Sequence, residues 1–154
     1  EVFGSLGISR NYRVEGQVLG KYLNDNFYGS RLVIEPAAGQ LFGSHNFEQI
    51  EITDGANASS TIEGSTESLD SEVSKVAELV MSHARWSPED SLMVVTASIT
   101  HAERIDQLVR QETYKQPQLA EYFDAQGREK LESVSMSEVT HRLADRVIYS
   151  VCFA

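Results

Sequence analysis

The chain has 154 residues, 41% hydrophobic and 23% charged, and its 23 acidic and 13 basic side chains give a formal net charge of −10. This length predicts one domain with its own core, and the apolar content excludes disorder as the default. A single cysteine, Cys152, excludes an intrachain disulfide and is expected to be a small buried hydrophobe. No apolar run approaches the roughly 20 residues of a membrane span, and no leader is recognisable, so we expect a cytoplasmic protein without membrane contact.

The charges are spread unevenly along the chain. Residues 46–90 carry ten acidic and two basic side chains, whereas residues 1–35 carry four of each. No contiguous basic stripe exists, which disfavours an autonomous nucleic-acid binder that relies on neutralising phosphates. Within the acidic region, residues 53–67 consist mainly of Ser, Thr, Gly, Asn and acids and are expected to form a loop insertion.

The first third of the chain predicts one helix and two strands. Residues 14–28 are expected to be helical, because apolar side chains recur there at helical spacing. Residues 31–35 form a short apolar run that Pro36 ends, which is typical of a strand. An imperfect alternation over residues 47–52 predicts another strand. The helical row comprises Val18, Tyr22, Leu23 and Phe27.

The second half alternates helices with apolar strands. A strongly amphipathic helix begins at Leu69, and Thr100 and Glu103 have capping-box spacing at the start of another. A short helix is expected over residues 118–125, and strands over 91–96, 131–136 and 146–153. This order predicts an α/β fold with a mainly parallel sheet. The expected buried faces of the two long helices comprise Leu69, Val73, Val76, Ala77, Val80 and Met81, and Ala102, Ile105, Leu108 and Val109.

Several catalytic signatures are absent from the sequence. It contains no P-loop, no G-x-G-x-x-G fingerprint and no G-x-S-x-G elbow. Its four histidines are scattered without metal-ligand spacing, so we expect no metal site. Those histidines are His45, His83, His101 and His141.

The segment Ile8-Ser9-Arg10-Asn11-Tyr12-Arg13, with the helix that ends Phe27-Tyr28-Gly29 and with Leu32, resembles the start of the second RecA-like motor domain of superfamily-1 helicases. The resemblance places Tyr12 and Arg13 at the ATP cleft and makes Arg13 the catalytic arginine finger. A guanidinium suits this role because it is always charged, planar and forked, and so matches the charge of a phosphoryl group in transfer.

Residues 94–105 resemble the family's strand–turn–helix element T-P-Y-x-x-Q-x-x-x-I, with Ala97-Ser98 in place of Pro-Tyr and His101 in place of Gln. In relatives this turn contacts the nucleic-acid backbone, which implies that Thr96, Thr100 and His101 donate hydrogen bonds to phosphate. An ordinary capped helix start explains the same residues equally well.

Residues 134–150 resemble helicase motif V, which reads D-E-x-Q-G-x-E-x-D-x-V-I-x-S. Glu138, Asp145 and Ser150 match, but the central Q-G-x-E has become Thr140-His141-Arg142-Leu143. The resemblance makes Thr140 and His141 candidate nucleic-acid contacts. A histidine stands where the family has glycine, and Leu143 cannot replace a carboxylate, so this element indicates the fold more than the chemistry.

Together the three elements imply that residues 1–154 are part of a second RecA-like, P-loop NTPase-like domain with three layers. The parent protein would be an ATP-dependent helicase that uses ATP and Mg²⁺ on a first RecA-like domain and moves along single-stranded DNA or RNA. The chain alone is expected to hold no cofactor and to hydrolyse nothing, because such catalysis needs both domains.

Two other interpretations stay open. The domain is a degenerate RecA-like module with an interaction or regulatory role, which the changed Q-G-x-E stretch and the net charge of −10 favour. Alternatively it is an unrelated α/β enzyme, such as a flavodoxin-like or hydrolase domain, although no phosphate loop, nucleophile elbow or metal cluster supports this.

Overall fold

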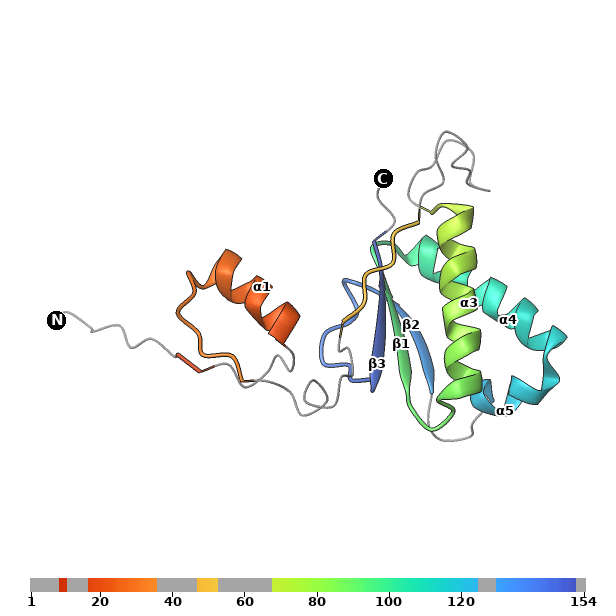
Figure 1. Cartoon of the computed structure of the whole chain (residues 1–154). Helices are drawn as coiled ribbons and strands as arrows, with labels where there is room; N and C mark the ends of the chain where they lie inside the picture. The colour runs from red at the N-terminus through yellow and green to blue at the C-terminus, as the bar shows by residue number, and fades with distance from the viewer. Residues whose placement is uncertain (1–8, 11–16, 36–46, 53–67, 125–129, 152–154) are drawn as a thin grey trace. The chain divides into compact units, whose positions relative to one another are not determined.

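The computed structural model describes residues 9–10, 17–35, 47–52, 68–124 and 130–151 (Figure 1). The chain divides into two compact units, Glu1–Glu51 and Ile52–Ala154, which we describe separately. The expectation of one domain over residues 1–154, with an insertion at 53–67, stays a prediction.

The first unit contains helix α1 (Gln17–Phe27), inside the range expected to be helical. Its packed side holds Asn24, whose Nδ2 donates to the carbonyl of Leu32 at 2.8 Å and whose Oδ1 accepts from the Leu32 amide at 2.9 Å. Asn24 therefore satisfies both backbone groups of Leu32, as a neighbouring strand would. The expected strand over residues 31–35 is reduced to one parallel bridge, between Arg10 and Val33.

Helix α1 does not bury the apolar row that the sequence predicted. Its buried residues are Gly20 and Asn24, whereas Val18, Tyr22 and Phe27 are exposed. Gly20 lies so close to the segment after the helix that an added Cβ would stand 2.9 Å from Cγ2 of Ile34. Close backbone approach thus decides which side of the helix packs.

The strand predicted over residues 47–52 is wrong. The structure describes these residues as having no regular secondary structure, and all of them are exposed. The apolar positions there alternate imperfectly, so they lack the single apolar face that fixes a strand on a core.

The second unit contains the predicted α/β alternation. Helix α3 (Asp70–Trp86) precedes strand β1 (Leu92–Thr96), and helix α4 (Ile99–Lys115) follows it. A 3-10 turn, η2 (Pro117–Leu119), and the short helix α5 (Ala120–Phe123) occupy the region of the short helix that we expected. Strands β2 (Leu131–Ser135) and β3 (Arg146–Ser150) complete the unit.

The three strands form one parallel sheet in the order β2-β1-β3. This confirms the α/β class and the parallel sheet. Strand β1 lies in the middle and is buried over its whole length, as its continuous apolar run predicts. Strand β3 is apolar too, but Val147 and Tyr149 are about half exposed because β3 is an edge of the described sheet.

Helices α3 and α4 cover one face of the sheet (Figure 1). Leu92 and Val94 of β1 pack there against the expected apolar sides of both helices. The opposite face is covered by residues 136–145, which connect β2 to β3 and must cross β1 to do so. Val139 and Ala144 of this connection pack on Met93, Val95 and Val134.

Helix α4 begins two residues earlier than the capping box implied. Its N-cap is Ser98, whose Oγ accepts a hydrogen bond from the amide of His101 at 3.2 Å. Thr100 lies inside the first turn, so the expected cap at Thr100 is wrong. Ser98 caps the helix with its hydroxyl, as a threonine would, and its backbone is extended as an N-cap requires. It stands two residues after the last residue of β1, so the helix starts directly after the strand.

Polar contacts hold the amino ends of β1 and β3 together. Asp145 Oδ2 accepts from the amide and the hydroxyl of Ser91, at 2.9 and 2.6 Å. Nearby, Nε2 of buried His83 lies 3.0 Å from the carbonyl of Asp90, and the His83 ring contacts Tyr122 edge to face. Burial, with the Asp90 and Asp145 carboxylates adding to it, raises the pKa of Tyr122 to about 12.

Two isoleucines of α4 test this core. Ile105 is fully buried between helices and sheet, whereas Ile99 is 55% exposed on the same helix. We expect Ile105→Ala to lower the free energy of unfolding by about 2–5 kcal/mol, because it leaves a cavity. Ile99→Ala should change it by less than about 0.5 kcal/mol. Chemical denaturation followed by circular dichroism would measure both, and equal losses would contradict the described core.

Candidate functional site at the carboxyl edge of the sheet

All three strands end on a hydroxyl residue in one row. Thr96 is in register with Ser135 on one side and with Ser150 on the other. All three residues are buried, and this edge is where parallel α/β sheets bind ligands. The carboxyl edge, defined by these three residues, is therefore the candidate site.

Buried His101 lies at the centre of a hydrogen-bond chain behind this edge. Its Nδ1 is 2.8 Å from Oγ of Ser68, and its Nε2 is 2.8 Å from Oγ of Ser150. Beyond the serines the chain continues to two charged groups. Arg104 donates to Ser68 at 2.6 Å, and Ser150 donates to the carboxylate of Glu72.

The charged ends fix the direction of this polar chain. Ser150 gives its only proton to Glu72, so it must accept from Nε2–H of His101. Ser68 accepts from the guanidinium and uses its own proton on Nδ1. The neutral Nε2–H tautomer of His101 follows, and each of these hydrogen bonds has one donor and one acceptor.

The chain joins three elements that are far apart in the sequence. Ser68 lies two residues before α3 and Glu72 in its first turn, His101 and Arg104 belong to the start of α4, and Ser150 ends β3. Arg104 also forms an ion pair with Asp70. Burial lowers the pKa of His101, and the Arg104 charge lowers it further, while the Glu72 carboxylate opposes both.

The arrangement has the atoms of a nucleophilic site but lacks access. A serine hydroxyl lies within hydrogen-bond distance of a histidine, as in hydrolases. Ser68 is only 1% exposed and His101 is fully buried, so no substrate carbonyl reaches either of them in this conformation. The network therefore holds the fold together, and the geometry does not favour a hydrolase.

The predicted nucleic-acid residues of the strand–turn–helix element divide into two groups. The side chains of Thr96 and His101 are fully buried, and Thr96 Oγ1 donates to the carbonyl of Ser98 at 2.7 Å. Both side chains bind partners within the fold in this structure, and their predicted contacts with phosphate stay predictions. Thr100 is exposed, and its predicted contact stays a prediction.

The predicted residues of the motif V-like loop, Thr140 and His141, are both exposed. His141 has a φ of 68°, in the left-handed region that favours glycine. Glu138 accepts from the hydroxyl of Ser135 at 2.8 Å and so ties the loop to the carboxyl edge. Leu143 is 96% exposed and contributes no polar group.

Two of the predicted site residues cannot be placed. Tyr12 and Arg13, assigned by resemblance to the ATP cleft, lie outside the described residues, as does Cys152. Their roles stay predictions. Among the described residues, no three His, Cys, Asp or Glu side chains gather as metal ligands.

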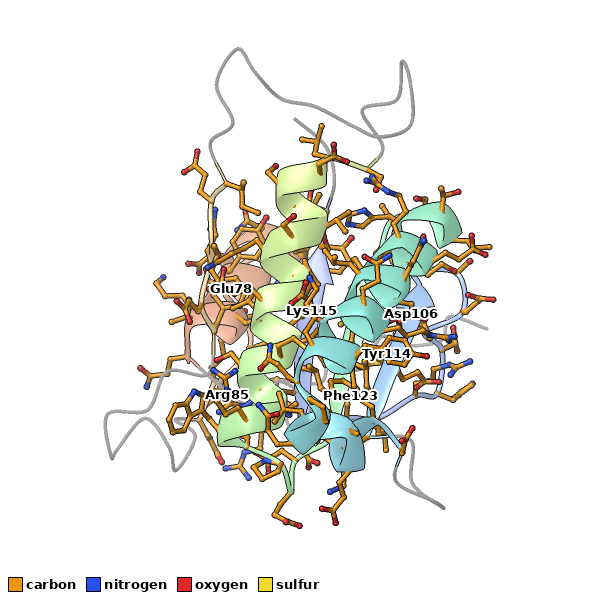
Figure 2. All side chains as sticks on the ribbon, turned by 90° about the vertical axis from the view of Figure 1, so that its right-hand side faces the viewer. Glu78, Arg85, Asp106, Tyr114, Lys115 and Phe123 are labelled. Atoms are coloured by element: carbon orange, nitrogen blue, oxygen red, sulfur yellow. The ribbon has the colours of Figure 1, made fainter. Side chains whose placement is uncertain are left out.

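A groove of about 430 Å³ lies between α3 and α4 on the far side from the sheet. Figure 2 looks onto this face and labels Glu78 and Arg85 on α3 and Lys115 on α4. The charges at its rim are already engaged within the chain: Arg85 with Gln116 at 2.6 Å, and Glu112 with Lys115 at 2.7 Å. We therefore place no charged-ligand site there.

Sequence reasoning missed most of the polar chain. No role was predicted for Ser68, Glu72 or Arg104, and Ser150 appeared only as a match to the motif V pattern. The available signal was His101 on the apolar side of a helix, beside Ala102 and Ile105. A polar residue on a buried face requires partners, but the sequence does not name them.

The backbone at His141 supports a stability test. A left-handed φ costs a non-glycine residue roughly 1–2 kcal/mol. Glycine avoids this cost, but the gain in stability is only partial because glycine loses more conformational entropy on folding. We expect His141→Gly to raise the free energy of unfolding by about 0.5–1 kcal/mol. Thr140→Gly, at an exposed neighbour outside that region, should lower it by a similar amount. Denaturant titration measures both, and the same sign for the two variants would contradict the loop geometry.

Comparisons with known proteins identify no relative: no protein-family model, curated protein or solved structure matches the chain. The helicase resemblance thus rests on the three sequence elements. Within the part of the chain that the structure describes, none of the helices has the length and apolar character needed to cross a lipid bilayer. We infer the function from the residues and their geometry.

Proposed function

We propose that the chain is part of the second RecA-like motor domain of a superfamily-1 helicase or helicase-like ATPase. In this role Arg13 completes an ATP site whose P-loop and Mg²⁺-binding acid belong to a first motor domain. The sequence itself contains no P-loop. The parent protein would couple ATP hydrolysis to movement along single-stranded DNA or RNA.

The observation that carries the proposal is the backbone at His141. The resemblance aligns this position with the glycine of motif V, and the loop adopts there a φ of 68°. A positive φ is uncommon for a non-glycine residue, although histidine adopts it more often than most, so the match of position and conformation supports the proposal. The backbone at His141 is thus left-handed at the position where the family has glycine.

Two further features support the proposal. Asp145, which the pattern also requires, binds the amide of Ser91 and fixes where β3 starts beside β1. Strands β2 and β3, which are both parallel to β1, come before and after the loop, as the motif V resemblance predicts. The first turn of α4 follows the carboxyl edge, the loop leaves the same edge after Ser135, and Thr100, Thr140 and His141 are exposed.

A second candidate function is a RecA-like module without motor chemistry that binds a partner protein. One observation favours it: Leu143, at the position of the motif V glutamate, is a 96% exposed apolar side chain. Such a side chain has no role at a nucleotide cleft but suits a protein contact. Absence of ATP hydrolysis by the full parent protein would favour this function.

Arginine substitution in the full parent protein tests the first proposal. We expect Arg13→Ala to lower kcat for ATP hydrolysis about 10³-fold or more, as loss of an arginine finger does. The 154-residue chain alone should show no hydrolysis, because the phosphates are held by another domain. Steady-state phosphate release would measure both.

Arg10→Ala is the matched control. Arg10 precedes Arg13 by three residues and forms an ion pair with Glu35 at 2.9 Å, with both side chains more than half exposed. Such a pair contributes about 0–1 kcal/mol, so this variant should keep wild-type turnover. Hydrolysis by the isolated chain that Arg13→Ala abolishes, or equal losses in the two variants of the parent, would contradict the split site.

A further inference from the structure

The polar chain through His101 depends on the protonation state of one ring. In the neutral Nε2–H tautomer, Nδ1 accepts from Ser68 and Nε2 donates to Ser150. Both serines have their remaining hydrogen bonds fixed by charged groups, Arg104 on one side and Glu72 on the other. The ring is fully buried, so no bulk water substitutes for a lost partner.

A proton added to His101 conflicts with this arrangement at Nδ1. The imidazolium donates from both nitrogens, so Nδ1–H would meet the hydroxyl proton of Ser68. Ser68 would have to turn while it still accepts from Arg104, and the new positive charge would lie beside that guanidinium. The contact that ties the start of α3 to the start of α4 is thereby weakened.

A second conflict arises at Nε2. The nearest carboxylate oxygen, Oε1 of Glu72, is 4.0 Å from Nε2 and is now bound by the hydroxyl of Ser150. A charged ring attracts this oxygen away from Ser150. Among the described residues, the charged groups that act on the ring are Glu72 from α3 and Arg104 from α4, and Arg104 is itself paired with Asp70 of α3, whereas β3 presents the neutral Ser150.

We propose that His101 is an acid-sensitive latch at the carboxyl edge, whose protonation releases the first turns of α3 and α4 from the end of β3. The rest of the sheet stays paired, because β1 and its helices are held by the apolar core. This inference goes beyond the proposed function and does not depend on ATP or nucleic acid. It makes the edge that would face a ligand sensitive to pH.

The direction of the effect follows from the lowered pKa of His101. The closed state prefers the neutral ring, so the latch is fully stable above the ordinary histidine pKa of 6.5. Its stability falls as the pH drops below that value towards the lowered pKa of the closed state, since the open state binds the proton more tightly.

Amide hydrogen exchange of the 154-residue chain tests the latch at about pH 7.5 and at about pH 5. After correction for the intrinsic pH dependence of exchange, we expect a loss of protection at the lower pH in residues 70–74, 99–104 and 148–150. Protection in the middle of β1 should not change. The same samples report the protonation of the His101 ring through its NMR shifts, without any substitution.

His101→Gln keeps one donor and one acceptor but cannot titrate, and it should remove the loss of protection between the two pH values. His83→Gln is the matched control, because it removes the other described buried histidine, at the opposite edge of the sheet, and should leave the loss in place. Protection that is unchanged while the wild-type ring becomes protonated would overturn the latch. The latch would also be overturned if the loss of protection at low pH persisted in His101→Gln, or if it disappeared only in His83→Gln.

Discussion

The polar chain from Arg104 through His101 to Glu72 determines how the second unit closes at its carboxyl edge. Apolar packing positions α3 and α4 on the sheet, but it does not fix where their first turns lie relative to the end of β3. Five side chains do this by forming one directed series of hydrogen bonds between a guanidinium and a carboxylate. A buried network of this kind is stabilising only when every member is satisfied, because an unpaired buried polar group costs about 1–3 kcal/mol.

The position of β1 explains the remaining architecture. As the middle strand it must be apolar on both faces, and its two sides are covered differently, by α3 and α4 on one face and by the connection 136–145 on the other. That connection must run back across β1 because β2 and β3 lie on opposite sides of it. The left-handed backbone at His141 lies within this connection.

Local patterns predicted most of the second unit and little of the first. Periodic apolar residues gave α3 and α4, and the continuous run in β1 gave a central strand, because both signals arise from burial against a large core. In α1 the same reasoning selected Val18 and Tyr22, but the buried residues are Gly20 and Asn24. Gly20 allows a close approach of the chain, and Asn24 binds the backbone of Leu32. Hydropathy encodes neither contact. At the carboxyl edge the sequence identified His101 and Thr96 but assigned them to a ligand. His101 binds Ser68 and Ser150, which are 33 and 49 positions away and which only the fold brings to it, and Thr96 binds the carbonyl of Ser98, two residues along the chain.

His101 is neutral and carries its proton on Nε2, because Glu72 and Arg104 set the direction of every hydrogen bond between them. Nitrogen NMR of the imidazole at about neutral pH measures this directly, since protonated and unprotonated ring nitrogens have well-separated shifts. We predict a protonated Nε2 and an unprotonated Nδ1, with the Nε2 proton slow to exchange. A proton on Nδ1, an imidazolium, or two nitrogens that exchange rapidly between tautomers would contradict the claim.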